Sequence, residues 1–254
     1  MAIDFTVQMI QATVNFEQSL GNETKRTGSA FFVNAPDPQG RPRTVLVTAR
    51  HLVQTMPNDQ ARLGLRFQQP DGAWRLRWST VQVRVAGIPQ WTEHPAQDVA
   101  VMTVQVPPEI ARAAIPLEWL AQSDTFERYD VGPGDEMVTL GYPGGYSANK
   151  LGFPILRAGR IASYPLGPLT EFPTFILDFT VMPGHSGGPV FMPEDARRRS
   201  GSSVLSRPFV AGVLSQSSDS LELGFVTHAQ FVREAIALMD QSAAPAPALA
   251  PAGP

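Results

Sequence analysis

The sequence predicts an all-β protein made of two six-stranded antiparallel β-barrels with a C-terminal helix. Short segments with period-two alternation and many β-branched residues recur along most of the chain. The 21 Gly and 24 Pro among 254 residues interrupt the chain too often for long helices to dominate. Because the segments form two groups of about six, we expect two small barrels rather than one large sheet.

The first group of predicted strands occupies the N-terminal part of the chain, and the second group follows a proline-rich connector. The first group comprises Thr6–Phe16, Ser29–Asn34, Thr44–Thr48, Arg62–Phe67, Trp74–Val85 and Val99–Val104. The second comprises Met137–Gly141, Ile155–Tyr164, Thr174–Thr180, Pro189–Met192, Phe209–Ser215 and Leu223–Val226.

One helix is predicted near the C-terminus. Thr227 and Gln230 have the spacing of a capping box, and apolar residues between Val232 and Met239 fall on one helical face. We therefore expect a helix over Thr227–Asp240. Residues 241–254 consist mainly of Ala and Pro, which predicts a disordered tail.

These elements divide the chain into four parts. We expect an N-terminal barrel over residues 1–120, a connector over 121–134, a C-terminal barrel with its helix over 135–240, and the tail over 241–254. Residues 194–208 are rich in Arg and Ser, and we expect a solvated loop there.

Composition excludes several functional classes. The absence of Cys excludes a disulfide framework, a thiolate metal site and a cysteine nucleophile. A net charge of −3 offers no electrostatic footprint for nucleic acid, and no apolar run is long enough to cross a membrane. No two His have the spacing of metal ligands, so we expect neither a metal nor a cofactor. Without Cys or a signal-peptide pattern, we expect a cytoplasmic protein, or a periplasmic one if the chain is a processed form.

Three segments carry residues suited to nucleophilic catalysis. An apolar strand ends at His51, Asp98 opens another apolar strand, and Ser186 lies in a loop of Gly and Pro. A serine nucleophile needs a neutral imidazole to take its proton and an acid to fix the tautomer of that imidazole. His51, Asp98 and Ser186 supply these three groups.

The loop around Ser186 also suits an oxyanion hole. Small residues allow the backbone N–H groups of Gly184 and Ser186 to point toward one position, where they could stabilise the oxyanion of a tetrahedral intermediate. Gly187 and Gly188 allow close approach of substrate and backbone.

The three segments, in the order His, Asp, Ser, resemble the signatures of chymotrypsin-like serine peptidases. The resemblance rests on Thr48–His51, Asp98–Val101 and Gly184–Pro189. Gly132–Val138, followed by Gly141–Pro143, resembles the opening of the second barrel in the bacterial Deg-type (HtrA-like) branch. Asp178–Gly184 is similar to the segment just ahead of the nucleophile in that branch.

The resemblance implies a serine endopeptidase that acts on proteins or peptides through an acyl-enzyme. It implies that the first barrel carries His51 and Asp98 and that the second carries Ser186. It also implies a primary specificity pocket bordered by Thr180, Ser215, Gln216 and Phe225. Because no carboxylate stands at Thr180, where trypsins keep one, we expect a small or medium uncharged side chain to bind there. The Ala/Pro tail could tether a regulatory partner protein.

Two residues depart from the family pattern, and two other His call for an interpretation. His185 replaces the Asp that pairs with a freed N-terminus in proteolytically activated members, so we expect no such activation. Arg50 replaces a small residue before His51, and we expect its side chain to face solvent or an acid. We interpret His94 as structural and His228 as a surface residue.

Two alternatives from other classes remain. Gly184–Gly188 also matches the nucleophile elbow of an α/β-hydrolase esterase, in which the serine opens a helix. A catalytically silent protease fold that acts as a binding module is the other alternative.

Overall fold

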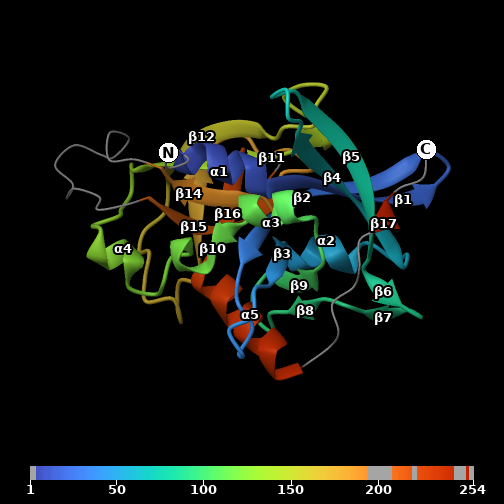
Figure 1. Cartoon of the computed structure of the whole chain (residues 1–254). Helices are drawn as coiled ribbons and strands as arrows, with labels where there is room; N and C mark the ends of the chain where they lie inside the picture. The colour runs from blue at the N-terminus through green and yellow to red at the C-terminus, as the bar shows by residue number, and fades with distance from the viewer. Residues whose placement is uncertain (1–3, 194–207, 219–221, 243–249, 252–254) are drawn as a thin grey trace.

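A computed structural model of the chain describes residues 4–193, 208–218, 222–242 and 250–251. It consists mostly of β-strands, arranged as one large sheet in the N-terminal half and one closed barrel in the C-terminal half (Figure 1). A C-terminal helix lies across the lower part of the view in Figure 1.

The N-terminal sheet is nine-stranded and runs in the order β17-β5-β4-β1-β2-β3-β9-β8, with β10 paired to β2. The short strands β6 and β7 form a separate hairpin. The strands are β1 (Thr13–Gly21), β2 (Thr24–Asn34), β3 (Thr44–Thr48), β4 (Gln60–Gln68), β5 (Trp74–Gln82), β6 (Arg84–Val85), β7 (Ile88–Pro89), β8 (Thr92–Glu93), β9 (Ala100–Val104), β10 (Ile115–Pro116) and β17 (Ala250–Pro251).

The C-terminal barrel closes in the order β11-β12-β13-β16-β15-β14 and is antiparallel throughout. Closure removes the exposed strand edges. Its strands are β11 (Glu136–Gly141), β12 (Ile155–Ile161), β13 (Thr174–Asp178), β14 (Pro189–Met192), β15 (Phe209–Ser218) and β16 (Leu223–His228). The predicted second barrel is therefore confirmed, whereas the first strand group forms a sheet without a closed path.

Helices are short, with one exception. The thirteen-residue α5 (Gln230–Ser242) packs against β8 and β9 of the first sheet and against β16 of the barrel. It thereby joins the two halves. The other helical elements are α1 (Phe5–Ala12), α2 (Arg50–Gln54), α3 (Pro108–Ala113), α4 (Thr125–Arg128) and the 3₁₀ turns η1 (Leu117–Trp119) and η2 (Pro143–Gly145).

The central strands β3 and β9, and the second half of β2, are buried on both faces, which explains their nearly continuous apolar runs. In β2, Ala30 and Phe32 belong to the core of the first sheet, while Phe31 and Val33 belong to a core shared with the barrel and α5. Alternate residues of one strand point to opposite faces, so β2 contributes to both cores. The two halves are thus packed together through a common apolar interior.

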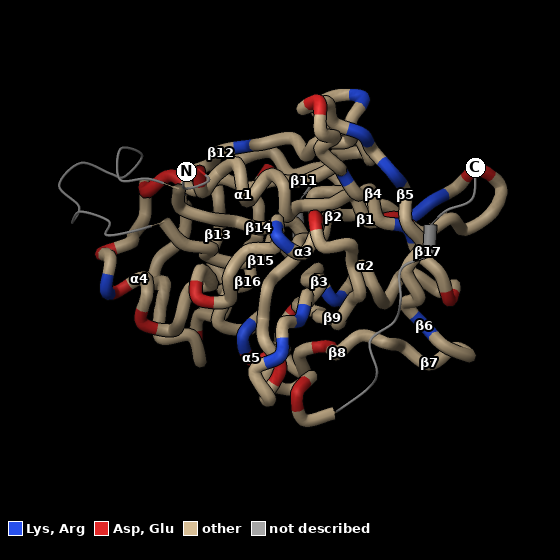
Figure 2. The backbone as a smooth tube through the Cα atoms, in the orientation of Figure 1, with Lys and Arg blue, Asp and Glu red and all other residues tan. Residues whose placement is uncertain are grey.

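Charged residues of the first sheet are paired across strands. Arg residues lie along β4 and β5 (Figure 2), and Arg62 of β4 pairs with the buried Glu17 of β1. Lys25 of β2 also contacts Glu17, at 2.8 Å. A buried carboxylate needs such partners because its desolvation is costly.

Three sequence predictions are wrong in part. The predicted strand Thr6–Phe16 begins with α1 instead, because the Asp4 carboxylate accepts the Val7 N–H at 2.9 Å and caps a helix. The predicted strand over residues 74–85 ends at Gln82, and β6 follows it.

The predicted capping box is also wrong. Thr227 lies in β16 and pairs with Val213, so α5 begins three residues later and continues to Ser242. Of the predicted tail, residues 243–249 and 252–254 lie outside the described residues, and so do residues 194–207 of the predicted loop. The backbone of Ala250 and Pro251 pairs with β5.

Candidate active site

His51 and Asp98 form a two-point contact. The His51 Nδ1 lies 2.7 Å from Asp98 Oδ2, and the backbone N–H of His51 donates to Asp98 Oδ1 at 2.8 Å. His51 is placed by the end of β3 at Thr48 and the start of α2 at Arg50. Because the carboxylate holds both the ring and the main chain, the orientation of the imidazole is fixed, and Nε2 is left for another partner.

The loop that carries Asp98 is held from two sides. Arg50 Nη1 donates to the carbonyls of His94 and Pro95, at 2.8 and 3.2 Å. The Nδ1 of His94 accepts the N–H of Gln97 at 3.0 Å. The expectation that Arg50 faces solvent or an acid is therefore wrong. Its guanidinium instead ties the helix of His51 to the loop of Asp98.

His94 has a structural role in this arrangement, as interpreted from the sequence. It is 6% exposed, its Nε2 lies 3.2 Å from Glu234 of α5, and its ring packs edge-on against Phe231. The loop before Asp98 is thereby attached to the C-terminal helix.

The main chain of Ser186 is joined to the first sheet. The Ser29 N–H of β2 donates to the Ser186 carbonyl at 2.8 Å. A Cβ at Gly187 would lie 2.1 Å from the Ser29 carbonyl oxygen, 2.2 Å from Thr48 Oγ1 and 3.1 Å from the Ala49 nitrogen. Only glycine fits there, and the loop of Ser186 meets the first sheet two residues before His51.

Carbonyl groups of the loop from Pro183 to Ser186 all accept hydrogen bonds from surrounding donors. The donors are Gly144 N–H to Pro183 at 2.6 Å, Ser29 Oγ to Gly184 at 2.7 Å, Gly188 N–H to His185 at 3.0 Å and Ser29 N–H to Ser186 at 2.8 Å. Among the described residues, no protein acceptor takes the N–H of Gly184 or Ser186. The sequence predicts these two groups as oxyanion donors, and that stays a prediction here.

His185 is buried behind the loop. It is 0% exposed, and its Nδ1 accepts the Met182 N–H at 3.0 Å. Burial and the charge of Arg157 lower the pKa of His185 to about 4, while its backbone bond to Met182 opposes the shift. This His is therefore neutral at pH 7.

Residues predicted to border the specificity pocket occupy different environments. Thr180 is exposed, two residues beyond the end of β13. Ser215 is 3% exposed, and its hydroxyl donates to the carbonyl of Phe225 at 3.1 Å. Gln216 pairs with Phe225 next to an irregularity in β15. Ser215, Gln216 and Phe225 therefore lie together, on β15 and β16.

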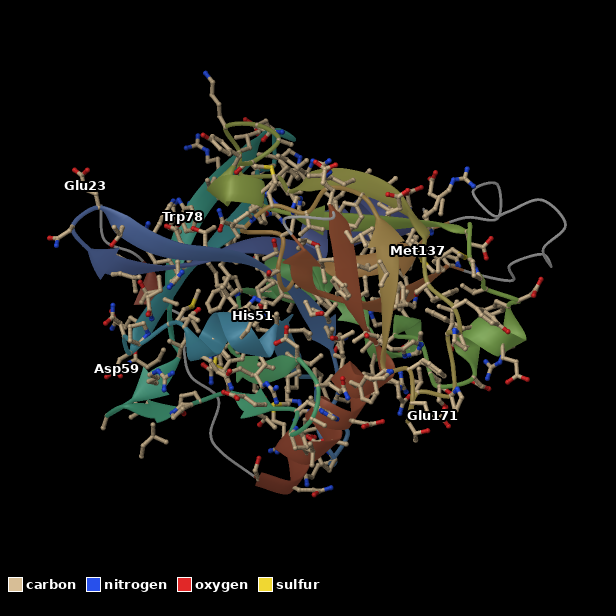
Figure 3. The ribbon with its side chains drawn as sticks, turned by 180° about the vertical axis from the view of Figure 1, so that it is seen from behind. Glu23, His51, Asp59, Trp78, Met137 and Glu171 are labelled. Atoms are coloured by element: carbon tan, nitrogen blue, oxygen red, sulfur yellow. The ribbon has the colours of Figure 1, made fainter. Side chains whose placement is uncertain are left out.

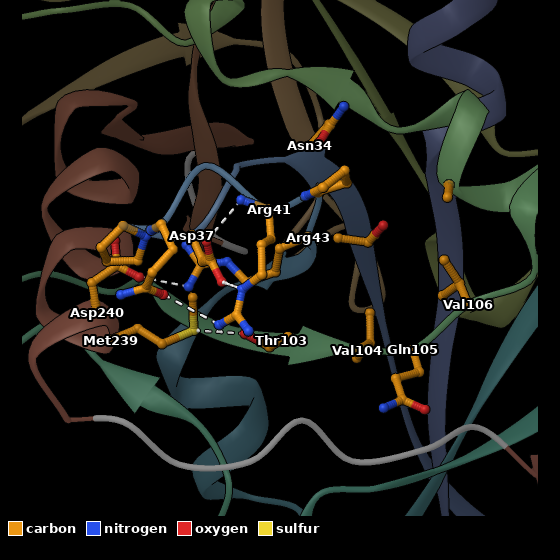
Figure 4. A pocket seen from close by; sticks show the side chains of 15 residues that line it. Asn34, Asp37, Arg41, Arg43, Thr103, Val104, Gln105, Val106, Met239 and Asp240 are labelled. Carbon is orange, nitrogen blue, oxygen red and sulfur yellow. Dashed lines mark hydrogen bonds and ion pairs between the residues drawn. The ribbon is translucent and has the colours of Figure 1, made fainter.

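The position of His51 in the whole molecule agrees with these contacts. Figure 3 shows His51 near the middle, between the first sheet, where Trp78 is labelled, and the barrel, where Met137 is labelled. A separate cavity of about 990 Å³ lies elsewhere, between the β2–β3 loop, β9 and the end of α5. Its wall contains the ion pair of Arg43 with Asp240, at 2.5 Å (Figure 4), and none of the three predicted catalytic residues lines it.

Sequence reasoning missed the residues that support the loop of Ser186. Ser29 was assigned only to a predicted strand, and its hydroxyl bonds to both Gly184 and Tyr142. Arg66, which is 5% exposed, donates to the Tyr142 hydroxyl at 2.8 Å. No local signal distinguishes Arg66 from Arg62, another Arg of the same strand. The interpretation of His228 as a surface residue is wrong, since it is 1% exposed.

The α/β-hydrolase alternative does not fit the structure. Ser186 is followed by strand β14 rather than by a helix, and β14 pairs antiparallel with both neighbours. In the described ranges, no helix is long and apolar enough to span a membrane.

Known proteins resemble this chain in sequence and in fold. Residues 28–197 match the model of the trypsin-like peptidase domain. No curated protein matches the chain. An inactive mutant form of Rv3671c from M. tuberculosis H37Rv is 22% identical, with a TM-score of 0.52 over 94% of this chain and 91% of that one. A serine endoprotease from Yersinia pestis is 14% identical, with a TM-score of 0.56 over 95% of this chain and 68% of that one. The active form of the Rv3671c protease is 22% identical, with a TM-score of 0.51 over 92% and 83% of the two chains.

Proposed function

The chain belongs to the family of the trypsin-like peptidase domain and is thus a serine protease, and on this premise we propose that His51, Asp98 and Ser186 are its catalytic triad. The observation that carries the proposal is the two-point contact of Asp98 with His51, at 2.7 and 2.8 Å. It leaves the Nε2 of a neutral His51 free to accept a proton, which is the requirement for activating a serine hydroxyl.

Each residue then has one role in an acyl transfer. His51 takes the proton of Ser186 as Oγ attacks the peptide carbonyl, and Asp98 stabilises the resulting imidazolium. The C–N bond breaks as His51 gives that proton to the leaving amine, and an acyl-enzyme remains. Water, deprotonated by His51, then attacks the ester and releases the carboxylic acid and free Ser186.

The N–H groups of Gly184 and Ser186 are the proposed oxyanion donors. The carbonyl groups of the loop from Pro183 to Ser186 are all hydrogen-bonded, as described above, and this arrangement supports the proposal. It turns both N–H groups away from the protein acceptors around the loop. Backbone donors held in this way need no reorganisation as charge develops on the substrate oxygen.

A small, uncharged side chain is the proposed preference of the primary pocket. A Cβ at Gly224 would lie 2.8 Å from the Phe179 ring, 3.0 Å from Val181 and 3.2 Å from Leu214. Phe179 and Val181 are 8% and 6% exposed. Apolar side chains thus already crowd the wall that Gly224 contributes, which leaves little room for a long side chain. A peptide-library profile dominated by cleavage after Arg or Lys would contradict this preference.

We also propose that the first sheet is the wall of a first barrel. The hairpin of β6 and β7 continues from β5, and β8 returns to pair with β9, so the two ends of the sheet are connected by one short excursion. The Val83 N–H donates to the Asp59 carbonyl at 2.8 Å and draws this excursion toward the start of β4.

The triad is tested by reaction with a fluorophosphonate followed by intact-mass measurement. The native protein should gain one adduct, and Ser186→Ala should gain none. Ser123→Ala is a matched control, because it removes an exposed serine of the connector, and it should react like the native protein. A native protein that never reacts would overturn the assignment and favour the silent binding module.

A further inference from the structure

Ser29 bridges the first sheet and the loop of Ser186. It lies in β2, is 0% exposed, and contacts the loop through both its backbone and its side chain. Its N–H donates to the Ser186 carbonyl at 2.8 Å, and its hydroxyl donates to the Gly184 carbonyl at 2.7 Å. The carbonyl oxygen of Ser29 accepts from Thr48 Oγ1 at 2.8 Å, which fixes this part of β2 to β3.

The direction of the Ser29 hydroxyl proton follows from its two bonds. The Tyr142 N–H donates to Ser29 Oγ at 3.1 Å and occupies a lone pair of the oxygen. A hydroxyl has one proton to donate, and it is used for the Gly184 carbonyl. Removal of this oxygen would leave a buried carbonyl and a buried N–H without a partner, which is unfavourable at both ends.

Three bonds fix the peptide groups on either side of Gly184. The Gly144 N–H holds the carbonyl of Pro183 at 2.6 Å, Ser29 holds the carbonyl of Gly184, and the His185 N–H donates to the Met182 carbonyl at 3.1 Å. In a trans peptide the N–H points opposite to the C=O, so the bond from Gly144 turns the Gly184 N–H toward the other side. Gly184 has φ +100°, a conformation that glycine leaves easily unless both adjoining peptide groups are restrained.

Tyr142, the other partner of Ser29, is itself firmly held. Its hydroxyl lies 2.8 Å from Arg66 Nη1 and donates to the Gly152 carbonyl at 3.0 Å. Arg66 extends from β4 and also donates to the Thr13 carbonyl. Burial raises the pKa of Tyr142, so the hydroxyl keeps its proton. The N–H group that donates to Ser29 Oγ therefore belongs to a residue with little freedom to move.

From these contacts we propose that Ser29 is a positioning residue for the oxyanion hole: by holding the Gly184 carbonyl, its hydroxyl restrains the backbone of Gly184 on one side, while Gly144 holds the Pro183–Gly184 peptide, which carries the Gly184 N–H, on the other. The inference rests on the proposed function, because it concerns the same site. Ser29 does not touch the reacting atoms. It acts through Gly184, and the first sheet thereby takes part in forming an oxyanion hole whose donors all belong to the second half of the chain.

The test is Ser29→Ala, assayed for cleavage of a peptide amide and for inhibition by a matching peptide aldehyde, whose hemiacetal oxygen occupies the oxyanion position. We expect kcat to fall by about 10- to 100-fold with KM changed less than about 2-fold, since a misplaced oxyanion donor affects the transition state selectively. Binding of the aldehyde should weaken by a similar factor, whereas a product peptide, which has no oxyanion, should bind as before.

A matched control separates positioning from stability. Thr125→Ala also removes a buried hydroxyl bonded to the backbone, where Thr125 Oγ1 accepts the Gln122 N–H at 2.8 Å in the connector. It should lower the melting temperature comparably and leave kcat unchanged. If Ser29→Ala does not fold, Ser29→Cys keeps an atom of similar size with a weak donor and should show the same selective loss of kcat.

Crystal structures distinguish failure of this role from failure of the proposed function. A Gly184 N–H turned from its native direction in Ser29→Ala supports the role even if the native protein cleaves nothing, an outcome that would overturn the proposed function alone. An unchanged direction of the Gly184 N–H in Ser29→Ala overturns the role of Ser29, and so does a kcat of Ser29→Ala equal to that of an active native enzyme. Equal losses of kcat in Ser29→Ala and Thr125→Ala would also overturn it.

Discussion

Replacement of Asp98 by Asn should impair catalysis while the fold is preserved. The asparagine carbonyl oxygen can still accept the His51 N–H, which Asp98 accepts at 2.8 Å. The amide NH₂ would then face His51 Nδ1, where Asp98 now presents an oxygen at 2.7 Å. Two donors cannot share one bond, so Nδ1 must lose its proton and Nε2 must carry it. In that tautomer, His51 cannot accept the proton of Ser186.

The expected loss can be given a magnitude. The wrong tautomer costs about 10⁴-fold in kcat in the general serine-protease triad, equivalent to about 5 kcal/mol of transition-state stabilisation. Stability should change far less, by about 1 kcal/mol, because one of the two hydrogen bonds is kept and the side chain retains its volume. Activity and stability are therefore expected to separate clearly in this variant.

Turnover of a peptide amide, with active sites titrated, measures this loss, and thermal unfolding measures the stability. Asp71→Asn is a suitable control, because Asp71 lies in the exposed β4–β5 turn and accepts the Ala73 N–H at 2.9 Å. It should retain native turnover. A kcat for Asp98→Asn within about 10-fold of native would refute the assigned role of Asp98.

Three further variants test other parts of the account. Gly184→Ala should lower kcat by about 10²- to 10³-fold, since its Cβ would lie 2.2 Å from the Tyr142 carbonyl oxygen and displace an oxyanion donor; native kcat in steady-state assays would exclude Gly184 as a donor. Arg50→Ala should lower kcat by about 10-fold by releasing the loop of Asp98, and faster hydrogen exchange in that loop should accompany the loss. Burial lowers the pKa of His228 from 6.5 to about 4, so the unfolded chain binds the proton first as the pH falls. The free energy of unfolding should therefore decrease by up to about 3 kcal/mol as the pH falls from 6.5 to 4, and this residue should have no effect above that range. In His228→Phe, the free energy of unfolding measured by denaturant melts should decrease less over the same range.

Local pattern was sufficient to predict most strands and the loop of Ser186. Residues of β3 and β9 are mostly apolar on both faces because these two strands are buried on both sides, and such runs are readily recognised as strands. In contrast, α1 carries β-branched residues in its first turn, and Asp4 decides in favour of a helix there. That decision depends on one side-chain contact that periodicity does not reveal.

Contacts between residues far apart in the sequence could not be predicted from local sequence pattern. Ser29 and Gly184 are 155 residues apart, and Arg66 and Tyr142 are 76 apart. Neither pair has a sequence signature, because a buried hydroxyl or guanidinium finds its partners only once the two halves are packed. The bond of Arg50 to the His94 carbonyl is of the same kind: a charged side chain satisfied by backbone oxygens has no acidic partner to suggest its place.

The central claim is that Ser186 is a nucleophile whose substrate oxygen is held by two backbone N–H groups. A crystal structure of the fluorophosphonate-treated protein tests it most directly. The account predicts phosphorus bonded to Ser186 Oγ, with one phosphoryl oxygen about 2.7–3.1 Å from the nitrogens of Gly184 and Ser186. Phosphorus on another residue, or a phosphoryl oxygen turned away from both nitrogens, would contradict it.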